Sequence, residues 1–173
     1  MSEVKLQALT RHEAENILEI LPNLQDIWER PKAKELVVLS TIRWGTENSA
    51  GQIYLIQTAQ DNTPIGIIGY FPTQNHDKAL SMRWHGILKE YRGNKYAYKA
   101  MCLMVDDIKK KYPGEYAYLC ESAPLDRPEL IEHFKKISFK EADFKAMDAL
   151  DNDYEDYPET ITLIAPFEAF PIN

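Results

Sequence analysis

The chain has 173 residues, of which 45% are hydrophobic and 27% charged, with 7 glycines and 10 prolines. This composition is typical of a folded globular protein and excludes collagen-like, low-complexity and disordered classes. Two cysteines, Cys102 and Cys120, are too few for a disulfide framework or a cysteine-built zinc site. No apolar run approaches the roughly 20 residues that span a bilayer, and the N-terminus lacks a signal-peptide pattern. We therefore expect a single cytoplasmic domain over residues 1–173 with no membrane partner.

The charge is unevenly distributed along the chain. The formal net charge is −7, which argues against nucleic acid as a partner. Six acids and no Lys or Arg lie between Asp148 and Glu159, whereas seven bases and three acids lie between Lys89 and Lys111. We expect an anionic ligand near the basic segment and a cationic one near the acidic segment.

The N-terminal third predicts a strand followed by helices. Residues 4–9 alternate apolar and polar side chains, and Thr10 with Glu13 forms a capping box that opens a helix. Pro22 breaks this helix, and Pro31 begins a second one that runs toward Trp44. The alternative interpretation of this segment is a strand, which Val-Val-Leu at residues 37–39 also suits.

The middle of the chain predicts an antiparallel meander and then a helix. Three strand-like runs cover residues 52–59, 65–71 and 79–88, with turn signals between them. The apolar period then changes to about 3.6, giving one helix stripe from Ala97 to Ile108 that ends before Pro113 and Gly114.

The last third adds a buried strand over residues 116–120, a short helix from Pro128, and strands over 138–147 and 160–165. This order of elements predicts an α+β fold with a mixed, mostly antiparallel sheet flanked by helices.

Residues 91–97, Tyr-Arg-Gly-Asn-Lys-Tyr-Ala, join the third strand of the meander to the long helix. Main-chain N–H groups at a loop entering a helix form an anion site with the positive end of the helix dipole. Arg92, Lys95 and Lys99 add positive charge there, so the segment suits a pyrophosphate. The alternative interpretation is an ordinary turn at Gly93 and Asn94, with the lysines on a solvated helix face.

This loop resembles the acetyl-CoA loop of the GNAT N-acetyltransferases, which reads Arg or Gln, two residues, Gly, one residue, Gly or Ala. Arg92 and Ala97 match the first and last positions, and Gly93 matches the common Arg-Gly start. Lys95 stands where the middle glycine is usual. A side chain at this position rules out an obligatory positive φ there and leaves helical geometry open.

The resemblance extends over nearly the whole chain. The order of elements from Val4 to Ala165 is similar to that of the GNAT domain, and residues 134–139, Phe-Lys-Lys-Ile-Ser-Phe, resemble the family's Tyr-x-x-Leu-Gly-Phe. Phe134 replaces the usual tyrosine and Ser138 the usual glycine.

The resemblance implies direct transfer of an acetyl group from acetyl-CoA to a primary amine of a small molecule or peptide. It implies a single sheet of about seven strands that splays between strands four and five. The main chain of Ile87 and Leu88 would orient the thioester and the pantetheine arm at this splay. The pyrophosphate would lie against Arg92 and the amides of Gly93, Asn94, Lys95, Tyr96 and Ala97.

The catalytic groups stay open at this point. His85 on the fourth strand and Glu121 at the end of the fifth are the candidate bases, and His133 is more typical of a helix surface. The family's tyrosine protonates the departing thiolate, but Phe134 has no proton to donate. Tyr96, Tyr98 and Ser122 are alternative hydroxyls.

The acceptor is not determined by the residues. The acidic segment from Asp148 to Glu159 would attract a cationic amine, or it is a solvated loop. The resemblance also allows a homodimer. A rival function is a non-catalytic acyl-CoA sensor or partner-binding module of the same fold. The four scattered histidines lack metal-ligand spacing, so no metal is implied.

Overall fold

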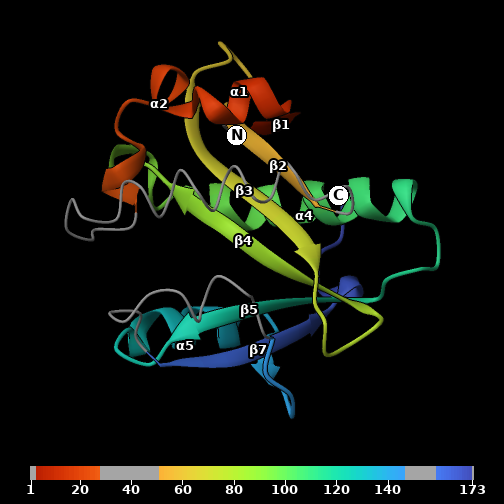
Figure 1. The fold of residues 1–173 in the computed structure, drawn as a ribbon. Helices are drawn as coiled ribbons and strands as arrows, with labels where there is room; N and C mark the ends of the chain where they lie inside the picture. The colour runs from red at the N-terminus through yellow and green to blue at the C-terminus, as the bar shows by residue number, and fades with distance from the viewer. Residues whose placement is uncertain (1–2, 28–50, 147–158, 173) are drawn as a thin grey trace.

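The computed structural model describes residues 3–27, 51–146 and 159–172. Within these residues seven strands form one sheet, in the order β1-β2-β3-β4-β5-β7-β6 (Figure 1). Every neighbouring pair is antiparallel except β4 and β5, which confirms the expected α+β fold with a mixed sheet. The strands are β1 Val4–Ala8, β2 Gln52–Thr58, β3 Pro64–Pro72, β4 Ala79–Ile87, β5 Tyr118–Pro124, β6 Lys140–Glu141 and β7 Thr160–Pro166.

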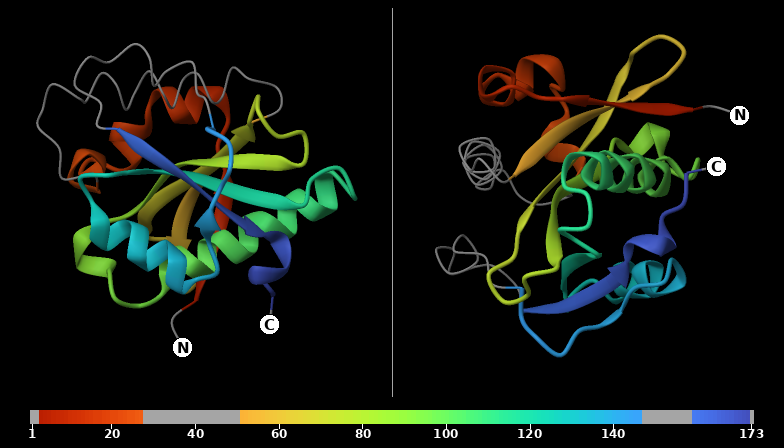
Figure 2. Two further views of the ribbon diagram at one scale, coloured as in Figure 1. Left: turned by 90° about the horizontal axis from the view of Figure 1, so that it is seen from below. Right: turned by 90° about the vertical axis from the view of Figure 1, so that its right-hand side faces the viewer.

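Helices cover both faces of the sheet. One face, which we call the α4 face, packs against α4 (Tyr96–Lys111) and α5 (Pro128–Lys136). The other, the α1 face, packs against α1 (Arg11–Glu15), α2 (Ile17–Ile20) and the short 3₁₀ helix η1 (Leu24–Ile27). Figure 2 shows α4 and α5 on the side of the sheet opposite α1 and α2.

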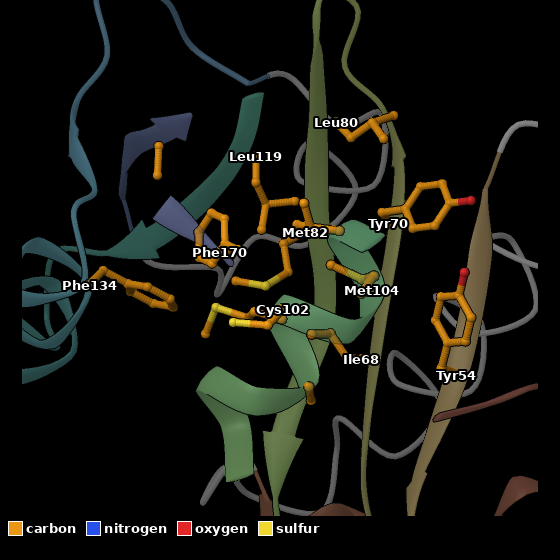
Figure 3. Packing of buried hydrophobic residues seen from close by; sticks show 14 of the residues in the cluster. Tyr54, Ile68, Tyr70, Leu80, Met82, Cys102, Met104, Leu119, Phe134 and Phe170 are labelled. Atoms are coloured by element: carbon orange, nitrogen blue, oxygen red, sulfur yellow. The ribbon is translucent and has the colours of Figure 1, made fainter. Parts of the chain in front are cut away.

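The α4 face holds the larger core, and the helix period of α4 explains why. The predicted stripe is buried, with Ala100, Met101, Met104, Val105 and Ile108 each 0% exposed. Figure 3 shows Met104 and Cys102 of α4 packed toward Ile68 and Met82 of the sheet. Burial of this stripe fixes α4, and therefore the loop that precedes it, against β3 and β4.

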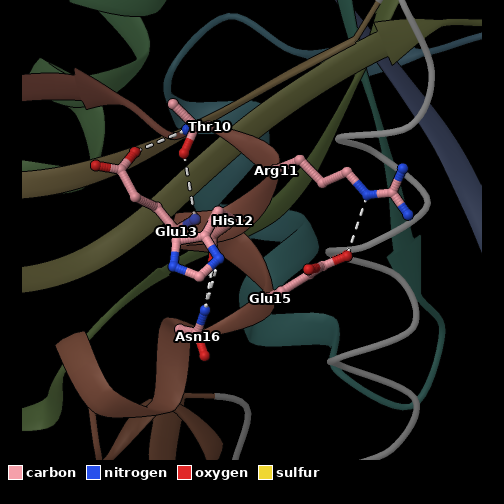
Figure 4. A network of polar contacts seen from close by, with 6 residues as sticks. All are labelled: Thr10, Arg11, His12, Glu13, Glu15 and Asn16. Carbon is pink, nitrogen blue, oxygen red and sulfur yellow. Dashed lines mark hydrogen bonds and ion pairs between the residues drawn. The ribbon is translucent and has the colours of Figure 1, made fainter.

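The predicted capping box is present at the start of α1 (Figure 4). The Thr10 hydroxyl accepts from the Glu13 N–H at 3.2 Å, and the Glu13 carboxylate accepts from the Thr10 N–H at 2.8 Å. The helix is shorter than expected, because Asn16 leaves helical geometry at φ −107° and ψ 24°. Its side-chain amide donates to the carbonyl of His12 at 2.8 Å. A second helix, α2, begins at Ile17.

Strands β4 and β5 separate soon after they meet. Their parallel pairing covers only three residue pairs, from Ala79 with Tyr118 to Ser81 with Cys120. Beyond this point β4 continues to Ile87 along β3, and β5 continues to Pro124 along β7. Figure 1 shows the two strands diverging, as the resemblance implies.

Three expected elements differ from the structure. The strand predicted over 138–147 is only Lys140–Glu141, because the main chain leaves the edge of β7 after Ala142 donates to Thr162. The strand predicted over 116–120 begins at Tyr118 and runs on to Pro124, because β7 pairs with its whole length. The helix predicted from Pro31 to Trp44 lies outside the described residues, as do residues 148–158 of the acidic segment.

Among the described residues no helix is both long enough and apolar enough to cross a bilayer.

Candidate active site

A bulge in β4 determines which side chains line the diverging strands. The register between β3 and β4 shifts between Ile67 and Gly69, and Trp84 has a φ of +52°. Positive φ is uncommon for a bulky residue and accompanies an extra residue in the strand. Arg83 and Trp84 consequently both lie on the α1 face, where each contacts the ring of Phe71.

The same bulge turns His85 to the α4 face. Its ring centroid lies 6.2 Å from that of Phe134 on α5. The Nε2 atom is buried and has no hydrogen-bond partner in the described structure. His85 lies four residues beyond Ser81, the last residue of β4 that pairs with β5. A histidine predicted as catalytic thus lies where the two strands have separated, with one ring nitrogen uncommitted.

Burial controls the charge of His85. Removal from solvent is the main reason that its pKa falls from 6.5 to about 4. Electrostatic repulsion from His133 lowers this pKa further. The imidazole is therefore neutral at pH 7. A protonated primary amine has a pKa of about 10, so moving its proton to His85 would be uphill by about 8 kcal/mol. Neutral His85 is a weak proton acceptor.

This low pKa predicts a stability effect. The folded protein disfavours protonated His85, so its contribution to stability is present above pH 6.5 and is lost as the pH falls toward 4. From pH 7 to pH 5 the wild type should lose about 2 kcal/mol more unfolding free energy than His85→Gln. Urea denaturation of both proteins at the two pH values measures this difference. Equal losses would show that the pKa of His85 is ordinary.

Glu121 lies inside β5, not at its end as the sequence predicted, because pairing with β7 carries the strand three residues further. Along β5, Leu119 and Ala123 are buried in the core of the α4 face, so Glu121 between them shares that face. His85 and Glu121 therefore project to the same side of the sheet from two diverging strands.

The loop before α4 has two left-handed residues. After the 3₁₀ helix η3 (Lys89–Tyr91) and an extended Arg92, Gly93 has a φ of +87° and Lys95 a φ of +58°. The expectation that Lys95 has no obligatory positive φ is wrong. Helix α4 starts directly after Lys95, and this reversal of the chain needs the left-handed conformation whichever residue occupies the position. The conformation matches the glycine usual there.

The N-terminus of α4 is open to an anion. The N-cap residue Lys95 makes no side-chain capping bond, and the first turn contains no acid. The first main-chain N–H groups of a helix have no partner within the helix. The Lys99 ammonium lies near this end of α4, 5.9 Å from the centre of the Tyr96 ring. Tyr96 itself is buried, and Ala97 follows it in the first turn. The arrangement suits a phosphate group.

Arg92 connects this loop to two other segments. Its Nε donates to the carbonyl of Ile87 at 3.0 Å, and its Nη2 donates to the carbonyl of Ile27 at 2.9 Å. Asn94 strengthens the loop, because its side-chain amide donates to the Tyr91 carbonyl at 3.2 Å. Two of the hydrogen bonds of Arg92 link η1 to the end of β4. Its expected place beside a pyrophosphate stays a prediction.

Ile87 and Leu88 are at the end of β4, as predicted, and both are buried. The Leu88 N–H donates to the carbonyl of Ile65 at 2.8 Å, and the Ile87 carbonyl accepts from Arg92. These two main-chain groups hold the end of β4 against β3 and the loop.

The alternative hydroxyls are dispersed. Phe134, 1% exposed, packs edge-on against Phe139 at 5.1 Å, so the position of the family's tyrosine is part of the core. Tyr98 donates to the carbonyl of Ala169 at 2.7 Å and is committed there. Ser122 lies one residue after Glu121, on the opposite face of β5. Its hydroxyl is buried and has no hydrogen-bond partner among the residues described.

Two features that shape the site were not found from the sequence. The positive φ of Trp84 has no sequence signal, because tryptophan carries no preference for that conformation. Ile27, which lies over Gly86, is 59 positions earlier in the chain. The sequence signal for this approach is the glycine itself, because a glycine near the end of a strand often marks a place where another segment comes close.

Comparisons with known proteins give the fold but no sequence family. No family model matches the chain, and no curated protein matches it. Among solved structures, it is similar to FdhC, described as a nucleotide-linked sugar GNAT, with a TM-score of 0.67 at 14% identity over 96% of this chain and 88% of the other. The chain has the GNAT fold.

Two further GNAT structures are similar over nearly their whole length. Spermidine N-acetyltransferase from Vibrio cholerae, in complex with CoA and spermine, has a TM-score of 0.62 at 13% identity, covering 96% of this chain and 97% of that one. AAC(6')-Ib in complex with ribostamycin and coenzyme A has a TM-score of 0.66 at 14% identity, covering 97% and 96%. The GNAT resemblance of the chain is thus confirmed as a likeness of fold.

Proposed function

We propose that residues 1–173 act as one acetyltransferase domain that transfers an acetyl group from acetyl-CoA directly to a primary amine of a small molecule or peptide. The observation that carries the proposal is the loop at Gly93 and Lys95, which opens α4 where β4 has just left β5. Two of the similar GNAT structures were solved with CoA together with spermine or ribostamycin, both of them amines.

The residues present fit a CoA molecule at this place. The uncapped N-terminus of α4, with Lys95 and Lys99, would hold the pyrophosphate through main-chain N–H groups and positive charge. The diverging part of β4 and β5 would receive the thioester, where Nε2 of His85 is buried with no hydrogen-bond partner among the described residues. Unpartnered buried polar groups are costly in a folded protein and are common where a ligand or water binds.

The reaction needs positioning more than covalent chemistry. The amine nitrogen attacks the thioester carbon, an N–C bond forms, and the C–S bond breaks with its electron pair on sulfur. We assign the amine proton to Glu121, directly or through water, because a carboxylate becomes neutral when it takes up a proton, whereas buried His85 would become positively charged. Glu121 then passes this proton to the CoA thiolate. The thiolate needs no strong acid to leave, so the reaction tolerates Phe134.

A charge reversal in the loop tests the donor site. Acetyl-CoA and CoA should both bind the wild type with measurable heat in titration calorimetry. Lys95→Glu should weaken both affinities about tenfold, because a carboxylate would face the phosphates at the helix N-terminus. Lys111→Glu, at the other end of the same helix, is the matched control and should leave both affinities unchanged. Absence of heat with the wild type would overturn the proposed function.

A second candidate is a CoA-binding protein without catalysis, and Phe134 is the observation that favours it. The aromatic ring in the core beside His85 offers no hydroxyl for proton donation. The two functions separate in a thiol-release assay with acetyl-CoA and a panel of polyamines, aminoglycosides and peptides. Release that depends on an amine supports acetyl transfer, whereas binding without release across the panel supports the sensor.

A further inference from the structure

His85 is a buried polar group on the α4 face. It is carried into that face by the bulge at Trp84, and its Nε2 atom is buried with no hydrogen-bond partner in the part of the chain that the structure describes. The ring packs against Phe134, an apolar neighbour that cannot satisfy it. His133 of α5 acts on the His85 ring by electrostatic repulsion, and Glu121 of β5 and apolar Ile68 of β3 lie on the same face of the sheet.

This environment favours one role over another. A base in the reaction must end with a positive charge, and a buried ring beside Phe134 and His133 holds that charge poorly. A neutral imidazole still has an N–H to donate. Donation to an oxygen that gains negative charge needs no proton transfer and is strongest away from water.

We propose that His85 is a hydrogen-bond donor to the carbonyl oxygen of the acyl thioester, and not the base that deprotonates the amine. The inference rests on the proposed acetyl transfer and adds the role of one residue to it. As the amine attacks, the C=O bond electrons move onto that oxygen, and the His85 N–H stabilises the charge. When the C–S bond breaks, they return and the pair leaves on sulfur. The His85 proton stays on nitrogen throughout.

The infrared spectrum of the bound thioester tests this directly. The carbonyl band of [1-13C]acetyl-CoA, taken as the difference from unlabelled acetyl-CoA, moves to lower frequency when a donor bonds to the oxygen. We expect a lower frequency on the wild type than on His85→Ala, with His85→Gln in between because its amide can donate. His133→Ala, an exposed neighbour, should match the wild type. An equal frequency on wild type and His85→Ala would overturn the proposal.

Binding selectivity gives a second readout. One added hydrogen bond to the carbonyl should make acetyl-CoA bind about fivefold more tightly than CoA to the wild type and to His85→Gln. His85→Ala should lose this preference while keeping its affinity for CoA. The opposite result would identify His85 as the base instead. In that case His85→Gln and His85→Ala lose the preference equally, and the wild-type rate falls at acidic pH in a way that neither variant shows.

The experiments distinguish failure of the proposed acetyl transfer from failure of the proposed role of His85. If the wild type binds neither acetyl-CoA nor CoA, acetyl transfer and the His85 role fail together. If it binds acetyl-CoA with an unshifted carbonyl band, only the His85 role fails. If His85→Ala does not fold, the wild type compared with His85→Gln decides the question, and an equal carbonyl frequency in these two proteins would overturn the His85 role.

Discussion

Gly86→Ala should lower the free energy of unfolding by about 3 kcal/mol. A Cβ atom at Gly86 would lie 1.8 Å from Cγ2 of Ile27 and 3.3 Å from its Cβ. Ile27 is 7% exposed and β-branched, so its side chain has little freedom to move away. Relief therefore requires η1 to lift from β4, which also breaks the bond from Arg92 to the Ile27 carbonyl. Urea denaturation measures the loss.

Two variants sharpen this test. Gly114→Ala adds a Cβ with nothing within 4 Å at a φ of +73°, so it should cost only about 1 kcal/mol, the strain of the left-handed backbone. Ile27→Ala combined with Gly86→Ala should be less unstable than the two single losses added together, because the alanine at 27 removes the clash. Strict additivity would show that the close approach is not the cause.

Phe134→Ala should lower the free energy of unfolding by about 4 kcal/mol. The ring is 1% exposed and packs against Phe139 and His85, so its removal leaves a cavity in the core of the α4 face. Water reaching that cavity would relieve the burial of His85, and the pKa of the imidazole should rise from about 4 toward 6.5. Thermal or urea denaturation gives the stability change, and NMR titration gives the pKa.

The conservative variant separates the two effects. Phe134→Leu refills most of the space, so it should cost about 1 kcal/mol and leave the pKa of His85 low. Phe144→Ala removes a half-buried ring from the opposite face and should leave that pKa unchanged. If the pKa of His85 stays low in Phe134→Ala, Phe134 is not the group that shields His85 from water.

Local patterns were enough to predict most of the fold. The meander of β2, β3 and β4 follows from alternating runs and turn residues, and α4 follows from its apolar stripe. The capping box at Thr10 and the proline at the start of α5 also act locally. Each of these signals is read within one element and does not depend on a distant partner.

The remainder depended on pairing between distant segments. The length of β5 is set by its pairing with β7, some 40 positions later. The local sequence therefore could not show whether Glu121 ends the strand or lies inside it. The partner of Arg92 at Ile27 is 65 positions away. The left-handed Lys95 shows the same limit, because the start of α4 imposes a conformation that lysine itself disfavours.

The short contact between β4 and β5 divides the sheet into two panels, β1 to β4 and β5 with β7 and β6, which share a seam of three residue pairs. So few main-chain bonds contribute little cohesion, and the apolar side chains beneath both panels must supply the rest. The angle between the panels is therefore governed by side-chain volume in that layer more than by strand pairing.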